Sequence, residues 1–280
     1  PPPPPPPPTP PAPPPSHPEP KPLSGLDVQI VVKPAEATAI SIGFPIDLTR
    51  ADDDFYALAV ANSYLGEHRT FNGKLMQDLR GKRGLNYGDY SYIEDFIQEG
   101  GSTFPIPNNH RSEQYFSIWI RPVPRDKAVF ALRAALWELD RLLEDGMSPE
   151  DFEATRSFLL NYSKLWVQTL SRRLGHQLEG PLYGRKDLVT ELAERLPKLT
   201  VEQVNAAVRK HLKSPGMRVA IVAQNADELR ELLTSGEPSP IAYDTEGTPE
   251  DVLAEDKEIA VFPLRDVKVR ITPVEQMFEK

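Results

Sequence analysis

The sequence predicts an α+β fold in which a mixed, mostly antiparallel sheet carries helices packed on one face. Three observations support this prediction. Strand-like runs of β-branched and aromatic residues dominate the first half, leucines at helical spacing dominate the second, and a further strand-like run follows those helices. Strands and helices that are grouped along the chain, instead of strictly alternating, are typical of this class.

Residues 1–25 are predicted to form a proline-rich disordered linker. Sixteen of the 31 prolines in this 280-residue chain lie in residues 1–22. Each proline lacks a backbone donor and constrains the residue before it, which excludes a helix or a sheet ladder. Polyproline II is the conformation we expect, and it makes a semi-rigid spacer. A ligand for an aromatic groove is the alternative interpretation.

A single domain is predicted to span residues 26–236. The first half of this domain alternates short apolar runs with Gly and Pro breakers, which set the element boundaries. Its predicted elements are, in order, strands at residues 28–32 and 37–44, a helix from residues 52–54 to Gly66, a second helix through Leu75 and Leu79 to Gly84, and strands at residues 87–93, 101–107 and 114–123.

Capping signals define the helices of the second half. Ser148 followed by Pro149 combines a hydroxyl cap with proline at the first helical position, and Thr200 with Gln203 has the spacing of a capping box. The predicted elements are helices at residues 126–144, 149 to about 174 and 201–211, a strand at residues 217–223, and a helix between Asn225 and Gly236. Residues 237–280 are predicted to be an irregular, acidic extension packed on the domain.

Composition excludes several classes of function. The formal charge of −9 and the pI near 5.2 argue against nucleic-acid binding, whose footprint is basic. The chain has no cysteine, so it has no disulfide framework and no thiolate nucleophile. No stretch approaches the roughly 18 consecutive apolar residues of a membrane span.

The sequence does not predict a metal site in this chain. The segment from His176 to Gly180 reads H-Q-L-E-G, which approaches the inverted zinc motif H-x-x-E-H but has glycine in place of the second histidine. One histidine and one glutamate do not hold a catalytic zinc. We interpret the segment as a polar cluster at a helix end.

The most informative stretch is Leu79–Tyr90, which joins a predicted helix to a predicted strand. Arg80 precedes Tyr87 by seven residues. A guanidinium and a phenol held together can donate hydrogen bonds to a carbonyl oxygen that gains charge during acyl attack. The alternative is a solvated, basic helix C-terminus followed by an ordinary sheet tyrosine, and the spacing alone favours this alternative.

A family resemblance favours the functional interpretation of Arg80 and Tyr87 over this structural alternative. The ordered run of Tyr64-Leu65-Gly66, Leu79-Arg80 and Arg83-Gly84-Leu85-Asn86-Tyr87 resembles the zinc-free, C-terminal-type half of the insulinase/pitrilysin peptidases. The resemblance covers residues 26 to 264 or so and implies a LuxS/metallohydrolase-like fold, as in one half of an insulinase-like clam-shell. In that family a half bearing H-x-x-E-H holds zinc, and the zinc-free half closes over an extended peptide.

The resemblance also implies roles for particular residues and partners. Arg80 and Tyr87 are expected to contact the scissile carbonyl of an extended peptide, which the family can add to a sheet edge. No cofactor is expected in this chain. Zinc is expected in a homologous H-x-x-E-H half, located upstream on the same polypeptide or on a separate subunit. The alternative function is a non-catalytic scaffold or peptide-binding module, as in the core subunits of the respiratory bc complex.

The loop before the second helix departs from the family pattern. It reads G-E-H-R-T-F-N-G from Gly66 to Gly73 and is bulkier than the small-residue version that is common in the family. His68 and Arg69 are candidate substrate contacts, with exposed loop residues as the alternative. The compartment is left open. The resemblance and the linker favour a bacterial periplasmic or secreted setting.

Overall fold

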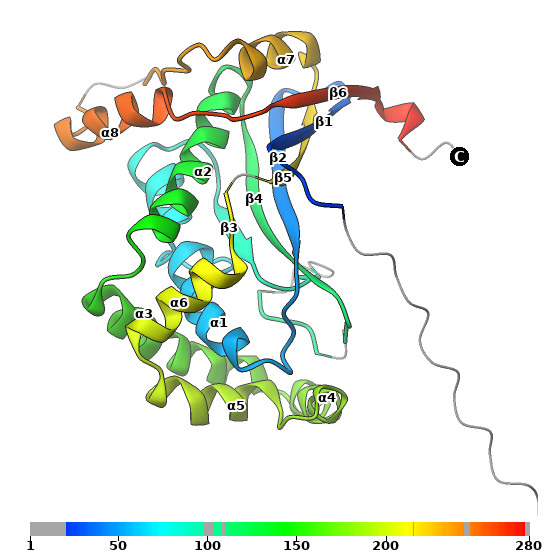
Figure 1. The fold of residues 1–280 in the computed structure, drawn as a ribbon, viewed down its shortest axis with the longest axis vertical. Helices are drawn as coiled ribbons and strands as arrows, with labels where there is room; N and C mark the ends of the chain where they lie inside the picture. The colour runs from blue at the N-terminus through cyan, green and yellow to red at the C-terminus, as the bar shows by residue number, and fades with distance from the viewer. Residues whose placement is uncertain (1–20, 98–102, 108–109, 215, 244–246, 278–280) are drawn as a thin grey trace, which may run out of the picture.

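A computed structural model describes residues 21–97, 103–107, 110–214, 216–243 and 247–277. Within these residues one sheet of six strands has the order β3-β4-β2-β5-β1-β6 (Figure 1). The strands are β1 (Leu26–Val32), β2 (Ala37–Ile46), β3 (Asp89–Tyr92), β4 (Gln114–Pro124), β5 (Met217–Ala223) and β6 (Lys268–Pro273). The neighbours from β3 to β5 pair antiparallel, whereas β1 pairs parallel with β5 and with β6. The predicted α+β fold is confirmed.

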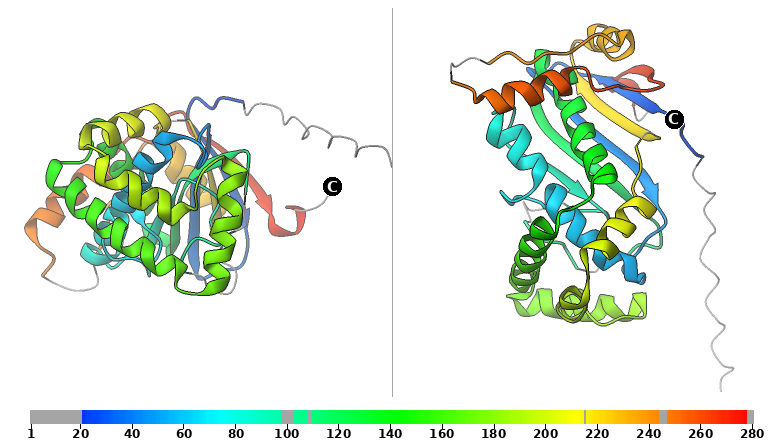
Figure 2. Two further views of the ribbon diagram at one scale, coloured as in Figure 1. Left: turned by 90° about the horizontal axis from the view of Figure 1, so that it is seen from below. Right: turned by 60° about the vertical axis from the view of Figure 1, so that its left-hand side comes forward.

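The helices gather on one side of this sheet, as Figures 1 and 2 show for α1, α2 and α6. The α-helices are α1 (Asp53–Gly66), α2 (Ala128–Glu144), α3 (Pro149–Tyr162), α4 (Leu170–Glu179), α5 (Leu188–Arg195), α6 (Val201–His211), α7 (Ala226–Ser235) and α8 (Glu250–Ala260). None of the described helices combines the length and the apolar character needed to cross a membrane.

Alternation along β2 shows why the sheet has two different faces. Ile40, Ile42 and Phe44 are buried toward the helices. Ser41 and Gly43 occupy the intervening positions and point to the opposite face, because successive side chains of a strand alternate. Helix packing therefore accounts for one face only, and on the other face the middle of β2 carries small side chains.

The predicted caps are formed. Ser148 accepts a hydrogen bond from the backbone N–H of Asp151 at the start of α3. Thr200 and Gln203 make both hydrogen bonds of a capping box at the start of α6. These local signals identified helix starts correctly because both partners lie within four residues of each other.

Two predicted boundaries were wrong. The helix expected to reach residue 174 ends at Tyr162 and passes into a 3-10 turn over Ser163–Val167. Thr169 then caps α4 by accepting from the N–H of Arg172, so a new helix starts in a new direction. Strand β2 also continues through Pro45, which the sequence suggested as its end. Pro45 carries no N–H, but β2 still pairs with β4 there.

The predictions for residues 101–107 and 237–280 also need correction. Residues 103–107 form no strand, and residues 101–102 lie outside the described part. The C-terminal extension is not irregular: it contains α8, which contacts α2, and β6, which pairs with β1. The alternation of Val269 and Ile271 is typical of a strand. The prediction missed this strand because the acidic residues that precede it suggested an irregular segment.

Candidate functional site

The Leu79–Tyr90 stretch begins in an unusual helix. Residues 74 and 75 are α-helical, and Met76–Lys82 form a π-helix instead of the α-helix expected from the sequence. The helix ends where the N–H of Gly84 donates to the carbonyl of Arg80 at 2.9 Å and the N–H of Leu85 donates to that of Leu79 at 3.1 Å. Gly84 takes the left-handed φ of 60° that this ending requires and that suits a residue without Cβ.

The structure brings Arg80 and Tyr87 together. The guanidinium carbon of Arg80 lies 5.2 Å from the ring centre of Tyr87 and 5.1 Å from that of Phe71. Both rings are largely exposed, at 79% for Tyr87 and 68% for Phe71. A guanidinium between two aromatic rings is held by cation–π attraction, while its N–H groups stay available to an acceptor. No pattern in the sequence predicts that Phe71 joins this stack.

A turn built on Asn86 fixes the backbone around Tyr87. The Asn86 amide Nδ2 donates to Asp89 Oδ1 at 2.6 Å and to the carbonyl of Arg121 at 2.9 Å, and Oδ1 accepts from the N–H of Gly88 at 2.9 Å. Burial raises the pKa of Asp89 to about 7. The side chain of Tyr87 projects from this turn into solvent. The Asn-x-Gly-Asp spacing of residues 86–89 was the sequence signal for this turn.

The second arginine of the stretch points elsewhere. Arg83 is buried and donates to Asp256 Oδ1 at 2.7 Å, to Glu255 at 3.0 Å and to the carbonyl of Asp78 at 2.9 Å. These contacts tie the end of the π-helix to α8. Arg83 therefore holds the Leu79–Tyr90 segment against α8, whereas Arg80 takes part in the stack with Tyr87.

The loop residues His68 and Arg69 have different surroundings. His68 is buried, not an exposed loop residue, and its Nδ1 lies 2.7 Å from the hydroxyl of Tyr92. Its ring also packs against Phe96 and Tyr90, with centroids at 4.4 and 4.9 Å. Arg69 is exposed and has a φ of 53°, which is unusual for a residue with a side chain. The structure places neither residue in the Arg80–Tyr87 stack.

The loop from Gly66 to Gly73, which follows α1, lies against the outer edge of β3. A Cβ added to Gly66 would lie 2.6 Å from the backbone nitrogen of Ser91, and one added to Gly73 would lie 2.8 Å from Gly66. The Ser91 hydroxyl also bonds to Asn62 at 2.9 Å. The edge of β3 is thus covered at Ser91. β3 is the strand nearest to Tyr87, and a peptide strand cannot be added to this covered part of it.

His176 and Glu179 do not fit a zinc ion. His176 Nδ1 lies 3.8 Å from Glu179 Oε2, but that carboxylate accepts from Arg50 at 2.6 Å. Both residues are buried, and burial together with the charge of Arg50 lowers the pKa of His176 to about 4. The cation that pairs with the Glu179 carboxylate is therefore the guanidinium of Arg50. Among the residues described, no group of three or more His, Cys, Asp or Glu side chains could hold a metal.

The fold and the site together define a two-layer α+β unit that carries an Arg–Tyr pair with an exposed tyrosine and, within the part of the chain that the structure describes, no cluster of side chains able to hold zinc. A family model described as the peptidase M16 inactive domain matches residues 2–159, which is more than half of the chain. The chain therefore belongs to this family, and the resemblance to insulinase-like peptidases is confirmed.

Similar proteins agree with this assignment. An uncharacterized zinc protease of Streptomyces coelicolor is 24% identical over 194 residues, which cover 69% of this chain and 38% of that protein. An uncharacterized zinc protease of Mycobacterium tuberculosis strain H37Rv is 24% identical over 200 residues, 71% of this chain and 41% of that protein. The chain thus spans about two fifths of the length of the curated relatives that it matches.

Solved structures show the same fold. The peptidase M16 inactive domain from Pseudomonas fluorescens matches with a TM-score of 0.57 at 21% identity, covering 71% of this chain and 43% of that one. A protease from Helicobacter pylori matches with a TM-score of 0.56 at 15% identity, covering 70% and 43%. A chain of complex III from Candida albicans matches with a TM-score of 0.56 at 14% identity, covering 73% and 47%.

Proposed function

We propose that this chain is the non-zinc half of an M16-type metallo-endopeptidase. It closes over an extended peptide and donates hydrogen bonds from Arg80 and Tyr87 to the scissile carbonyl. The observation that carries the proposal is the exposed stack in which the Arg80 guanidinium lies 5.2 Å from the Tyr87 ring. The family membership and the zinc-protease names of similar proteins support it.

The chemistry assigned to this chain is electrostatic. A carbonyl oxygen under nucleophilic attack gains negative charge, and donors aimed at it stabilise the transition state more than the bound peptide. Arg80 supplies a fixed positive charge with several N–H groups, and Tyr87 supplies one hydroxyl. A zinc ion in a homologous H-x-x-E-H half would supply the metal chemistry, and that half is the proposed partner.

Steady-state kinetics of the chain assembled with its H-x-x-E-H half, on an unstructured peptide, test the proposal. Tyr87→Phe retains the ring that stacks on Arg80 and removes only the hydroxyl, so kcat should fall about 10²–10³-fold, as for the loss of one oxyanion donor. Arg80→Lys should also lower kcat, because an ammonium cannot reproduce the guanidinium fork. Tyr162→Phe and Arg209→Lys are matched controls outside the stack.

The scaffold alternative gives the opposite results. An assembled complex that cleaves no peptide would support a non-catalytic module, whose fold is also found in the complex III chain of Candida albicans. An active complex whose kcat is unchanged by both Tyr87→Phe and Arg80→Lys would remove the two residues from the mechanism. Thermal melts of each variant separate a catalytic loss from unfolding.

A further inference from the structure

The face of the sheet opposite the helices carries a broad hollow of about 1350 Å³. Strand register defines its floor: Ser41 of β2 lies between Trp119 of β4 and Ala220 of β5, and Gly43 lies between Ser117 and Arg218. At these two levels the side chains of β2 are small, and one taller side chain stands beside each of them: Trp119 of β4 beside Ser41, and Arg218 of β5 beside Gly43. Neighbouring strands are about 4.8 Å apart, so the resulting trough is about 10 Å wide and follows β2.

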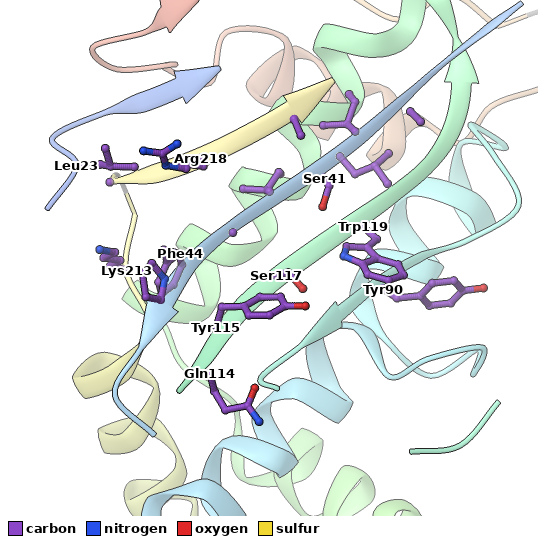
Figure 3. Close-up of a pocket in the computed structure, with 18 of the residues that line it drawn as sticks. Leu23, Ser41, Phe44, Tyr90, Gln114, Tyr115, Ser117, Trp119, Lys213 and Arg218 are labelled. Carbon is purple, nitrogen blue, oxygen red and sulfur yellow. The ribbon is translucent and has the colours of Figure 1, made fainter. Parts of the chain in front are cut away.

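The two flanks of the trough differ in chemistry. Tyr90, Trp119 and Tyr115 form an aromatic wall on the β3–β4 side, and Arg218 and Lys213 stand across from them (Figure 3). The aromatic wall is continuous with the proposed site, because Tyr90 follows the Asn86 turn and its hydroxyl approaches Gly88. A chain lying in the trough can thus lead toward Arg80 and Tyr87.

The rim of the hollow is basic, although the chain as a whole carries a charge of −9. Among the residues that the structure describes, its charged lining consists of Lys21, Arg111, Arg121, Lys213, Arg218 and one carboxylate, Glu113. Two of the cations are partly neutralised: Arg111 pairs with Asp95 at 2.7 Å, and Arg218 lies 3.6 Å from Asp27. The remaining three are exposed and keep the rim positive.

We propose that this trough binds an acidic, extended peptide segment, with its aromatic or proline side chains against the Trp119 wall and its carboxylates toward Arg218, Lys213 and Arg121. Charge complementarity favours an acidic peptide, because a basic peptide would be repelled by the positive charges on the rim. Strand β2 is ten residues long, so roughly ten residues of an extended chain match the trough. The bound peptide is a substrate only through the function proposed above; the binding itself does not depend on that function.

The test measures binding to the isolated 280-residue chain by fluorescence anisotropy. One labelled probe is an unstructured 12-residue peptide of Glu, Pro and Tyr, and the second has Lys at every Glu position. The acidic probe should bind at least tenfold more tightly at low salt and weaken as salt rises, because exposed charges are screened. Arg218→Glu combined with Lys213→Glu should weaken its binding at least tenfold, and so should Trp119→Ala. Lys257→Glu, on α8 in the helical layer, should leave binding unchanged.

Several results would overturn the proposal. Two of them are equal binding of the two probes and unchanged binding of the acidic probe in the Arg218–Lys213 double variant. A third is binding that appears only after deletion of residues 1–20, which would mean that the proline tract occupies the trough. A dimer that dissociates on Trp119→Ala would make a second copy the occupant. Failure here leaves the kinetic test of Arg80 and Tyr87 untouched. An inactive complex whose isolated chain still prefers the acidic probe would reject only the catalytic proposal.

Discussion

Arg80 and Tyr87 are seven residues apart in the sequence, and the guanidinium carbon of one lies 5.2 Å from the ring centre of the other. The left-handed ending of the π-helix at Gly84 and the Asn86 turn reverse the chain between them. Tyr87 is exposed and makes few packing contacts, so its position depends on the turn and on the stack. Substitutions can therefore probe function here without disturbing the core.

The turn should matter for catalysis even though Asn86 touches no substrate in the proposed arrangement. Asn86→Ala removes the hydrogen bonds to Asp89, Arg121 and Gly88, and we expect kcat of the assembled enzyme to fall by roughly tenfold. KM should change little, because the positioning of Tyr87 affects the transition state more than the bound peptide. A parallel rise in KM without loss of kcat would contradict the positioning role.

The chain alone should bind no zinc stoichiometrically and hydrolyse no peptide. Glu179 is engaged by Arg50, and Gly180 stands where a second histidine ligand would be needed. Metal analysis after dialysis against a zinc-containing buffer should find far less than one zinc per chain. One tightly held zinc per chain would contradict this prediction.

Arg50 should be a major determinant of stability. Its buried guanidinium donates to both oxygens of Glu94, at 2.7 and 2.9 Å, and to Glu179 at 2.6 Å. Arg50→Met leaves two carboxylates in a buried site without their cation, a change that costs about 3–5 kcal/mol. Chemical denaturation should show this loss. Adding Glu94→Gln and Glu179→Gln to the variant should recover part of it, and Arg209→Met should have little effect.

Glu138 on α2 should make stability depend on pH. Burial and the neighbouring Asp78 raise the pKa of Glu138 to about 8. The folded chain then holds a proton that the unfolded chain releases near pH 4.5, so this contribution to stability is complete below that pH. It is lost as the pH rises from about 4.5 to about 8. Lys74 and Arg141 face the same carboxyl and limit the effect.

Glu138→Gln, which resembles the protonated acid, should flatten this decline. Its melting temperature should exceed that of the unaltered chain by a few degrees at pH 9 and match it near pH 5. Glu144→Gln is the control, because Glu144 lies on the exposed side of the same helix. An unaltered slope in Glu138→Gln between pH 5 and 9 would show that this carboxyl titrates normally.

Local patterns in the sequence determined much of the fold. The alternation of residues 28–32, the caps at Ser148 and Thr200 and the run of residues 114–123 each depend on neighbours within a few positions. The Arg80–Tyr87 pair could be singled out only through the family resemblance, because its spacing alone favoured a solvated helix end followed by an ordinary sheet tyrosine. The family membership then followed from the same residues.

Only the tertiary structure decided the features that depend on contacts between distant residues. β6 is a strand because β1 supplies its hydrogen bonds from more than 200 positions earlier. His68 is buried because Tyr90, Tyr92 and Phe96 close around it. The trough has an aromatic and a basic side because strand register places Trp119 beside Ser41 and Arg218 beside Gly43. Periodicity and caps report what a residue does with its near neighbours, whereas pairing between strands and charge across a surface are set only when the chain folds.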